Sequence, residues 1–151
     1  MKINFLQQGD VQLFRINEIP NDAVEIKNSI LAEGTATGHK HQIVKGDYKC
    51  FERNGVLYLE VIEDSYLKHE EHSVKDKVSN LTTDHSSSLK SVLHEREIEY
   101  FETILKLDID KSIEELLPEI PHETIIPPGL WEVDIVEQID HFTEFVEKVR
   151  D

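Results

Sequence analysis

The chain has 151 residues, which is enough to bury one hydrophobic core and short for two. Its 31 Asp and Glu against 16 Lys and Arg give a net charge of −15. Such a charge argues against binding to nucleic acid, because phosphate contacts need clustered Lys and Arg, and it favours cations or a basic protein as partners. No stretch approaches the roughly 18 apolar residues of a membrane span, and the first residues lack a signal-peptide core. We therefore expect a single-domain cytoplasmic protein that binds neither nucleic acid nor membrane.

The single cysteine, Cys50, excludes an internal disulfide. It stands in the sequence YKCF, at the foot of an expected strand. We interpret it as a small apolar residue of the core rather than a reactive thiol or metal ligand.

Short strands separated by turn residues dominate the first half of the chain. Segments rich in Val, Ile and aromatic side chains predict strands over residues 11–16, 23–27, 33–44, 48–51 and 56–62. Apolar and polar residues alternate over residues 11–16, whereas the apolar residues are nearly continuous over residues 56–62, which suggests burial on both faces. Gly, Asn, Asp and Pro predict turns at Gly9-Asp10, residues 18–22, residues 45–47 and Asn54-Gly55. Residues 28–31 fit no single pattern.

The residue pattern of residues 73–121 differs and predicts helices. Residues 79–88 are polar and predict a loop, whereas apolar residues three and four apart predict an amphipathic helix over residues 89–107, with a gap at Arg96 and Glu97. A second short helix is expected to start at Ser112, which forms a capping box with Glu115, and to end at Pro118.

The strand pattern returns over residues 125–136, where a Pro-Pro-Gly turn precedes an alternating strand over residues 130–136, and a last short helix is expected over residues 141–150. These elements predict a mainly β (α+β) fold, a small β-barrel or sandwich with a cupin-like barrel as one form. The expected single domain, residues 1–151, has a β core from residues 1–72 and 122–151 and a helical insertion over residues 73–121. The helices of residues 89–117 are the expected surface for a protein partner or for oligomerisation.

His39 and His41 lie one residue apart in a segment that reads as a strand. Side chains at positions i and i+2 of a strand share one face, so both imidazoles can reach one ion. Gly34 and Gly38 fit a bent strand in which Gly38 clears space beside His39. Imidazole is a ligand for zinc and for other transition metals, so this pair predicts half of a metal site.

A second pair, His69 and His72, brackets Glu70 and Glu71. The spacing differs from the zincin motif, in which two histidines lie four apart on a helix. The pair reaches one ion if the strand ends and turns at the carboxylates. If the strand continues, His69 shares a face with Glu71, and Glu70 shares the other with His72. The alternative to these two metal-binding arrangements is that residues 69–72 form a solvated strand end that binds no metal.

His122 competes for the fourth ligand position, because removal of the insertion would bring it next to residues 69–71. The sequence leaves open whether His72 or His122 completes the site. His85 and His94, in the insertion, and His141, near the end, are interpreted as surface or packing residues.

Several motifs resemble those of a family of small, uncharacterised bacterial and phage proteins. The matching segments are Gly9-Asp10, Ile19-Pro20, residues 32–41, Tyr58 to Val61, Leu67 to His72, Pro127 to Trp131, and Gln138 to His141. The chain departs from the family pattern in its long insertion and in having His141 where the family has tyrosine. The resemblance implies a shared histidine-rich site and supplies no reaction.

Three functions remain open at this point. The first is a metal-binding protein that holds a structural or regulatory divalent transition metal, zinc first, through His39, His41, His69 and His72. The second is a metal-dependent enzyme, a hydrolase or cupin-like, in which three histidines hold the ion and Glu70 or Glu71 is the base. The third is an acidic interaction module without metal.

Overall fold

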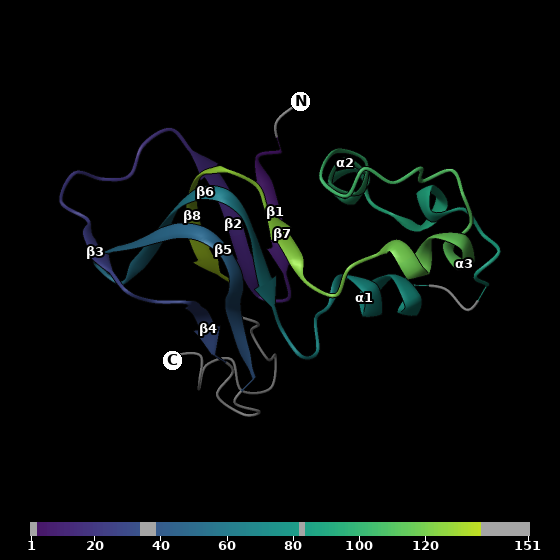
Figure 1. The fold of residues 1–151 in the computed structure, drawn as a ribbon, viewed down its shortest axis with the longest axis horizontal. Helices are drawn as coiled ribbons and strands as arrows, with labels where there is room; N and C mark the ends of the chain where they lie inside the picture. The colour runs from purple at the N-terminus through teal and green to yellow at the C-terminus, as the bar shows by residue number, and fades with distance from the viewer. Residues whose placement is uncertain (1–2, 34–38, 82–83, 137–151) are drawn as a thin grey trace, which may run out of the picture.

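The computed structural model describes residues 3–33, 39–81 and 84–136. Within these residues, eight strands form one antiparallel sheet in the order β1-β2-β8-β6-β5-β3, with β4 beside β5 and β7 beside β6 (Figure 1). The strands are β1 (Phe5–Gln8), β2 (Val11–Ile16), β3 (Val24–Ile26), β4 (Ile30–Glu33), β5 (Lys40–Arg53), β6 (Val56–Lys68), β7 (Thr124–Ile126) and β8 (Gly129–Ile135). The expected final helix, residues 141–150, and the glycines Gly34 and Gly38 lie outside the described residues.

The prediction of a mainly β fold with helices is confirmed, but the sheet is open and not closed into a barrel. Among the described strands, β1 pairs only with β2 and β3 only with β5, so each leaves one edge unpaired. A barrel would need hydrogen bonds between the two ends of the strand order. A cupin-like barrel is therefore not confirmed.

The helices lie between β6 and β7 in the chain and gather beside β1 and β7 in space, away from β3 (Figure 1). They are α1 (Val74–Asn80), the 3-10 turn η1 (Leu89–Val92), α2 (Glu95–Thr103), α3 (Ile113–Leu116) and the 3-10 turn η2 (Leu117–Glu119). The Tyr100 hydroxyl accepts a hydrogen bond from Ile125 N at 2.7 Å, which joins α2 to β7. No helix within the described ranges is long and apolar enough to cross a membrane.

The amphipathic pattern over residues 89–107 predicted one helix, and the structure divides it at Leu93 and His94. The Glu97 carboxylate accepts a hydrogen bond from His94 N at 2.9 Å. Glu97 thus caps the start of α2, a role that explains the gap in the apolar pattern. The predicted capping box of Ser112 and Glu115 is confirmed at the start of α3.

Two predicted turns are confirmed, and both join the strands of a hairpin, which was predicted only for Asn54-Gly55. Gly9 has φ +56° in the two-residue turn between β1 and β2, and Asn54 and Gly55 have φ 52° and +82° between β5 and β6. Two-residue hairpin turns need positive φ at such positions, where Gly and Asn are least strained. These local signals fixed the strand pairing on both sides of each turn.

The predicted turn at residues 45–47 is wrong, because β5 continues through it. The register between β5 and β6 shifts on either side of Lys45 and Asp47, as it does at a β-bulge. At Gly46, with φ +128°, an added Cβ would lie 2.5 Å from the Ser65 Cα. Glycine at this position allows the backbones of two paired strands to approach closely, a requirement that resembles a turn signal in the sequence.

Replacement of Gly46 by alanine is expected to lower the free energy of unfolding by about 2 kcal/mol or more, because the new Cβ meets backbone atoms that cannot move aside. Gly55 is the matched control. It also has positive φ but nothing lies within 4 Å of an added Cβ, so its alanine variant should lose only about 1 kcal/mol from backbone strain. Urea unfolding measures both. Equal losses would contradict the close packing at Gly46.

The hydrophobic core is formed by residues of both the strands and the helices and includes Trp131, which is fully buried on β8. The Trp131 indole donates from Nε1 to Pro127 O at 3.1 Å, and the Arg15 guanidinium lies 4.3 Å from the ring centroid. Cys50 is 2% exposed and belongs to the same core, so its predicted role as a small apolar residue is confirmed.

Candidate functional site

The ends of β5 and β6 bring four histidines together. His41 lies on β5, His39 precedes that strand, and His69 and His72 follow the end of β6. The His69 ring centroid lies 4.0 Å from that of His41, 4.5 Å from that of His72 and 5.8 Å from that of His39. The His41 and His72 centroids are 5.8 Å apart. We call these four residues the histidine cluster.

The convergence depends on how β6 ends. The strand stops at Lys68 and the chain bends at Glu70 and Glu71, so that His69 and His72 turn toward the same side. Of the two backbone courses that the sequence allowed, this is the one in which the strand ends at the carboxylates.

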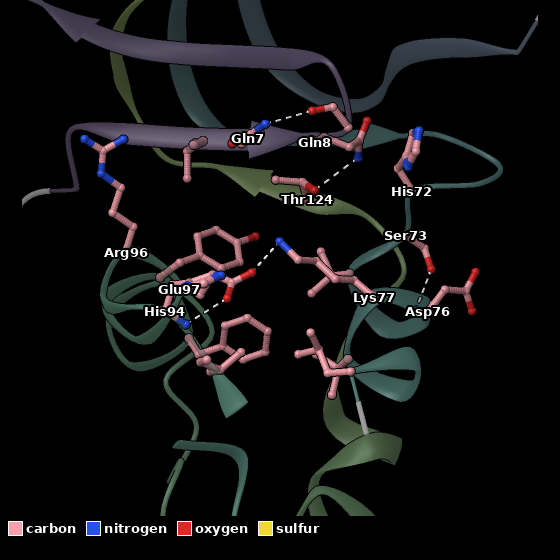
Figure 2. Close-up of a pocket in the computed structure, with 18 of the residues that line it drawn as sticks. Gln7, Gln8, His72, Ser73, Asp76, Lys77, His94, Arg96, Glu97 and Thr124 are labelled. Carbon is pink, nitrogen blue, oxygen red and sulfur yellow. Dashed lines mark hydrogen bonds and ion pairs between the residues drawn. The ribbon is translucent and has the colours of Figure 1, made fainter. Parts of the chain in front are cut away.

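His41 is buried, 5% exposed, and its Nδ1 lies 2.8 Å from Oε1 of Gln8. Gln8, also buried, donates from Nε2 to the Leu67 carbonyl oxygen at 2.7 Å. The same nitrogen donates to the Thr124 hydroxyl at 3.1 Å, as Figure 2 shows. The amide of Gln8 therefore links three strands, β1, β6 and β7, to the histidine cluster.

This network fixes the tautomer of His41. The Leu67 carbonyl oxygen can only accept, so the Gln8 amide nitrogen must face it and the amide oxygen must face His41. Because that oxygen also only accepts, the proton of neutral His41 sits on Nδ1. The Nε2 lone pair of His41 is then available to a cation, as it is in histidine ligands whose other nitrogen is held by a neighbouring group.

His69 has the opposite arrangement. The backbone N–H of Glu71 donates to His69 Nδ1 at 2.9 Å, so the proton of neutral His69 sits on Nε2. Neither nitrogen then offers an unused lone pair. A metal can use neutral His69 only after the bond from Glu71 is released.

Burial keeps the inner histidines neutral. Burial first, and then the neighbouring His69 and His72, lower the pKa of His41 to about 4. Burial and then the neighbouring imidazoles also lower the pKa of His69, while Glu71 and Glu70 oppose this change. At neutral pH His41 is therefore an uncharged ring whose protons do not compete with a cation.

The outer two histidines contact exposed or turn residues. The His39 nitrogens lie 3.5 Å from Glu70 Oε1 and 3.4 Å from Glu71 Oε1, and both carboxylates are more than half exposed. The His72 ring packs against the β1–β2 turn, where a Cβ at Gly9 would lie 2.5 Å from His72 Cδ2. The glycine of that turn thus also leaves room for the cluster.

The structure does not bring His122 into this group. It is exposed before β7, and its carbonyl oxygen accepts a hydrogen bond from Val74 N at 3.1 Å. Within the described residues, its ring has no contact with the cluster. His85 bonds through Nε2 to the Ser79 carbonyl oxygen at 3.3 Å and His94 is exposed at the start of α2, so both lie in the helical segment.

The histidine cluster has nitrogen donors suited to a metal ion, but its rings are not spaced as they would be around a bound ion. No group of three or more His, Cys, Asp or Glu within the described part of the chain is placed to hold a metal ion. Two imidazoles on one tetrahedral zinc, with Zn–N bonds of about 2.1 Å, have centroids roughly 5 Å apart, so the His69 ring would have to move about 1 Å from His41. A bound ion therefore requires the rings to separate and His69 to exchange its hydrogen bond.

Sequence reasoning did not identify Gln8 or Thr124 as parts of the site. A polar residue at an inward position of an alternating strand, Gln8 between Leu6 and Val11, was the only available signal. Gln8 and His72 also line a cavity of about 930 Å³ between β1 and the helices α1 and α2 (Figure 2).

Comparison with known proteins gives one match. Residues 7–75 match the model of a family described as a domain of unknown function (DUF8820). The matched residues include the whole histidine cluster and end in the first turn of α1, so the remaining helices lie outside them. Searches of the curated proteins and of the solved structures find no match. The chain is thus similar over about its first half to a domain whose function is unknown.

Proposed function

We propose that the protein binds one divalent transition metal, zinc first, through His39, His41, His69 and His72, as a structural or regulatory ion. The observation that supports this most is the meeting of four imidazoles from two strand ends, with centroids 4.0 to 5.8 Å apart. Neutral imidazole is a common ligand for such metals, and grouped imidazoles become charged only at the cost of mutual repulsion.

The surroundings of His41 favour the same function. Gln8 holds Nδ1 of His41 and leaves Nε2 for a metal, which is how neighbouring groups usually orient histidine ligands. Glu70 and Glu71, next to His39, add negative charge that offsets part of the charge of the ion. On binding, the Glu71 N–H would leave His69, so the Glu70-Glu71 bend would move with the metal.

Elemental analysis of untagged protein dialysed against zinc tests the proposal. We expect about one zinc per chain in the wild type and in His122→Ala, and none in His39→Ala/His41→Ala. Free zinc at 100 times its Kd should stabilise the wild type by about 2.7 kcal/mol and leave the double variant unchanged. Absence of zinc from the wild type would overturn the proposal, and loss of zinc from His122→Ala would overturn the ligand set.

A second candidate, a metal-dependent enzyme with Glu70 or Glu71 as the base, draws on the position of the cavity. Glu71 and His72 both line it, so a substrate there would lie beside a metal with an open position. The visible spectrum of the cobalt-substituted protein separates the two candidates. Four protein ligands give a spectrum insensitive to added anions, whereas three ligands and a water give one that changes with them.

A further inference from the structure

The cavity between β1, α1 and α2 has three different walls. Strand β1 contributes all four of its residues, α1 contributes Lys77 and Val78, and α2 contributes Arg96 and Tyr100 (Figure 2). Lys77 pairs with Glu97 and so joins the two helices on the side of the cavity that faces β1. The Arg96 guanidinium lies 4.3 Å from the Phe5 ring centroid.

The edge of β1 borders this cavity. Leu6 and Gln8 point to one face of the sheet and are buried, while Phe5 and Gln7 point to the other. Because all four residues line the cavity although their side chains alternate between the two faces, we infer that the cavity runs along the edge of the strand. Within the described residues, β1 has no strand partner on this side.

The hydrogen-bond pattern shows which backbone groups this edge offers. Arg15 N donates to Asn4 O at 2.9 Å, so Asn4 belongs to a hydrogen-bonded pair of the β1–β2 ladder. Antiparallel ladders alternate, so Leu6 and Gln8 also bond to β2, while the N–H and C=O groups of Phe5 and Gln7 point away from it. Within the described strands these four groups have no ladder partner, so they can bond to another extended chain.

The charged residues that line the cavity indicate the charge of the ligand that it would bind. Four carboxylates line the cavity, from Glu71, Asp76, Glu95 and Glu97, against two permanent cations, Lys77 and Arg96. Both cations are already engaged, with Glu97 and with the Phe5 ring. Among the described residues, no cation pairs with Asp76 or Glu95. The chain as a whole carries a net charge of −15.

From these observations we propose that the cavity binds an extended, basic peptide segment of another protein, which adds to the edge of β1 as a further strand. Backbone hydrogen bonds to Phe5 and Gln7 give the register, the apolar wall of α1 and α2 receives alternate side chains, and Asp76 and Glu95 receive Lys or Arg. The proposal does not depend on the metal, since β1 and the helices border the cavity without it.

Fluorescence polarisation with a labelled six-residue peptide of alternating lysine and valine, about 20 Å long when extended, tests the proposal. We expect the wild type to bind it and not the matched peptide of alternating glutamate and valine. Gln7→Pro removes an outward N–H at an edge position that tolerates proline, so it should weaken binding at least tenfold, whereas Gln7→Ala keeps the N–H and the affinity.

Charge reversal gives an independent test. Asp76→Lys/Glu95→Lys should weaken binding at least tenfold, and Glu25→Lys/Glu52→Lys, which changes the net charge equally on exposed residues of β3 and β5, should not. Circular dichroism checks that each variant is folded. Absence of binding, or equal losses in the two charge variants, would overturn the proposal. A wild-type dimer in sedimentation that Gln7→Pro dissociates would also overturn it, in favour of a second copy of this chain at the edge.

Discussion

Replacement of Gln8 by leucine is expected to lower the free energy of unfolding by about 3 kcal/mol, because it leaves buried polar groups without partners. Leucine fills a similar volume but makes none of the bonds of Gln8 to His41 Nδ1, Leu67 O and the Thr124 hydroxyl. Each such unpaired group costs about 1–3 kcal/mol, and part of this is recovered by local adjustment and by the apolar side chain.

The neighbouring residue gives the control for this experiment. Gln7 is exposed and, among the described residues, its amide bonds only to Gly9 O at 3.0 Å, so Gln7→Leu should change stability by no more than about 0.5 kcal/mol. Urea unfolding measures both variants. In the folded protein, ¹⁵N chemical shifts of His41 should also show the proton on Nδ1 in the wild type, and a mixture of tautomers in Gln8→Leu. Equal stability of the two variants would mean that the network contributes nothing.

Acidification of metal-free protein is expected to lower its stability by about 2 kcal/mol between pH 7 and pH 5, through His41 alone. The pKa of His41 is about 4 in the folded chain and 6.5 when it is unperturbed. Between these values the unfolded state binds the extra proton, so stability is fully present above pH 6.5 and is lost as the pH falls toward 4. His69, whose pKa is also lowered, adds to the loss.

Urea unfolding in the presence of a chelator, at several pH values, measures this dependence. His41→Gln removes the titrating group, so its stability should fall less between pH 7 and pH 5 than that of the wild type. His122→Gln, at an exposed histidine outside the cluster, should keep the wild-type slope. The explanation fails if the wild type and His41→Gln lose stability in parallel.

The sequence by itself determined the features that depend on neighbouring residues. Gly9-Asp10 predicted a turn and Asn54-Gly55 a hairpin, because Gly and Asn tolerate positive φ, and Ser112 with Glu115 predicted the start of α3 through a capping box. The spacing of His39 and His41 predicted two imidazoles on the same face of a strand, and both lie near His69, although His39 precedes β5.

Only the tertiary structure decided features that depend on contacts between distant segments. Residues 45–47 have the residue types of a turn, yet in the structure they belong to β5. Gly46 lies at a bulge there, packed against Ser65 of the partner strand β6. In the sequence, Glu97 interrupts the apolar pattern of an expected helix. The structure shows that its carboxylate caps the start of α2.

The histidine cluster depended partly on the sequence and partly on the tertiary structure. Two pairs of histidines were visible in the sequence, but the bend that joins them, the exclusion of His122 and the role of Gln8 depended on how β1, β6 and β7 meet. Whether the sheet closes also depended on the partners of its two edges, which no local pattern specifies. Local backbone preferences thus set the turns and helix ends, while side-chain burial and strand pairing across the whole sheet arranged the site.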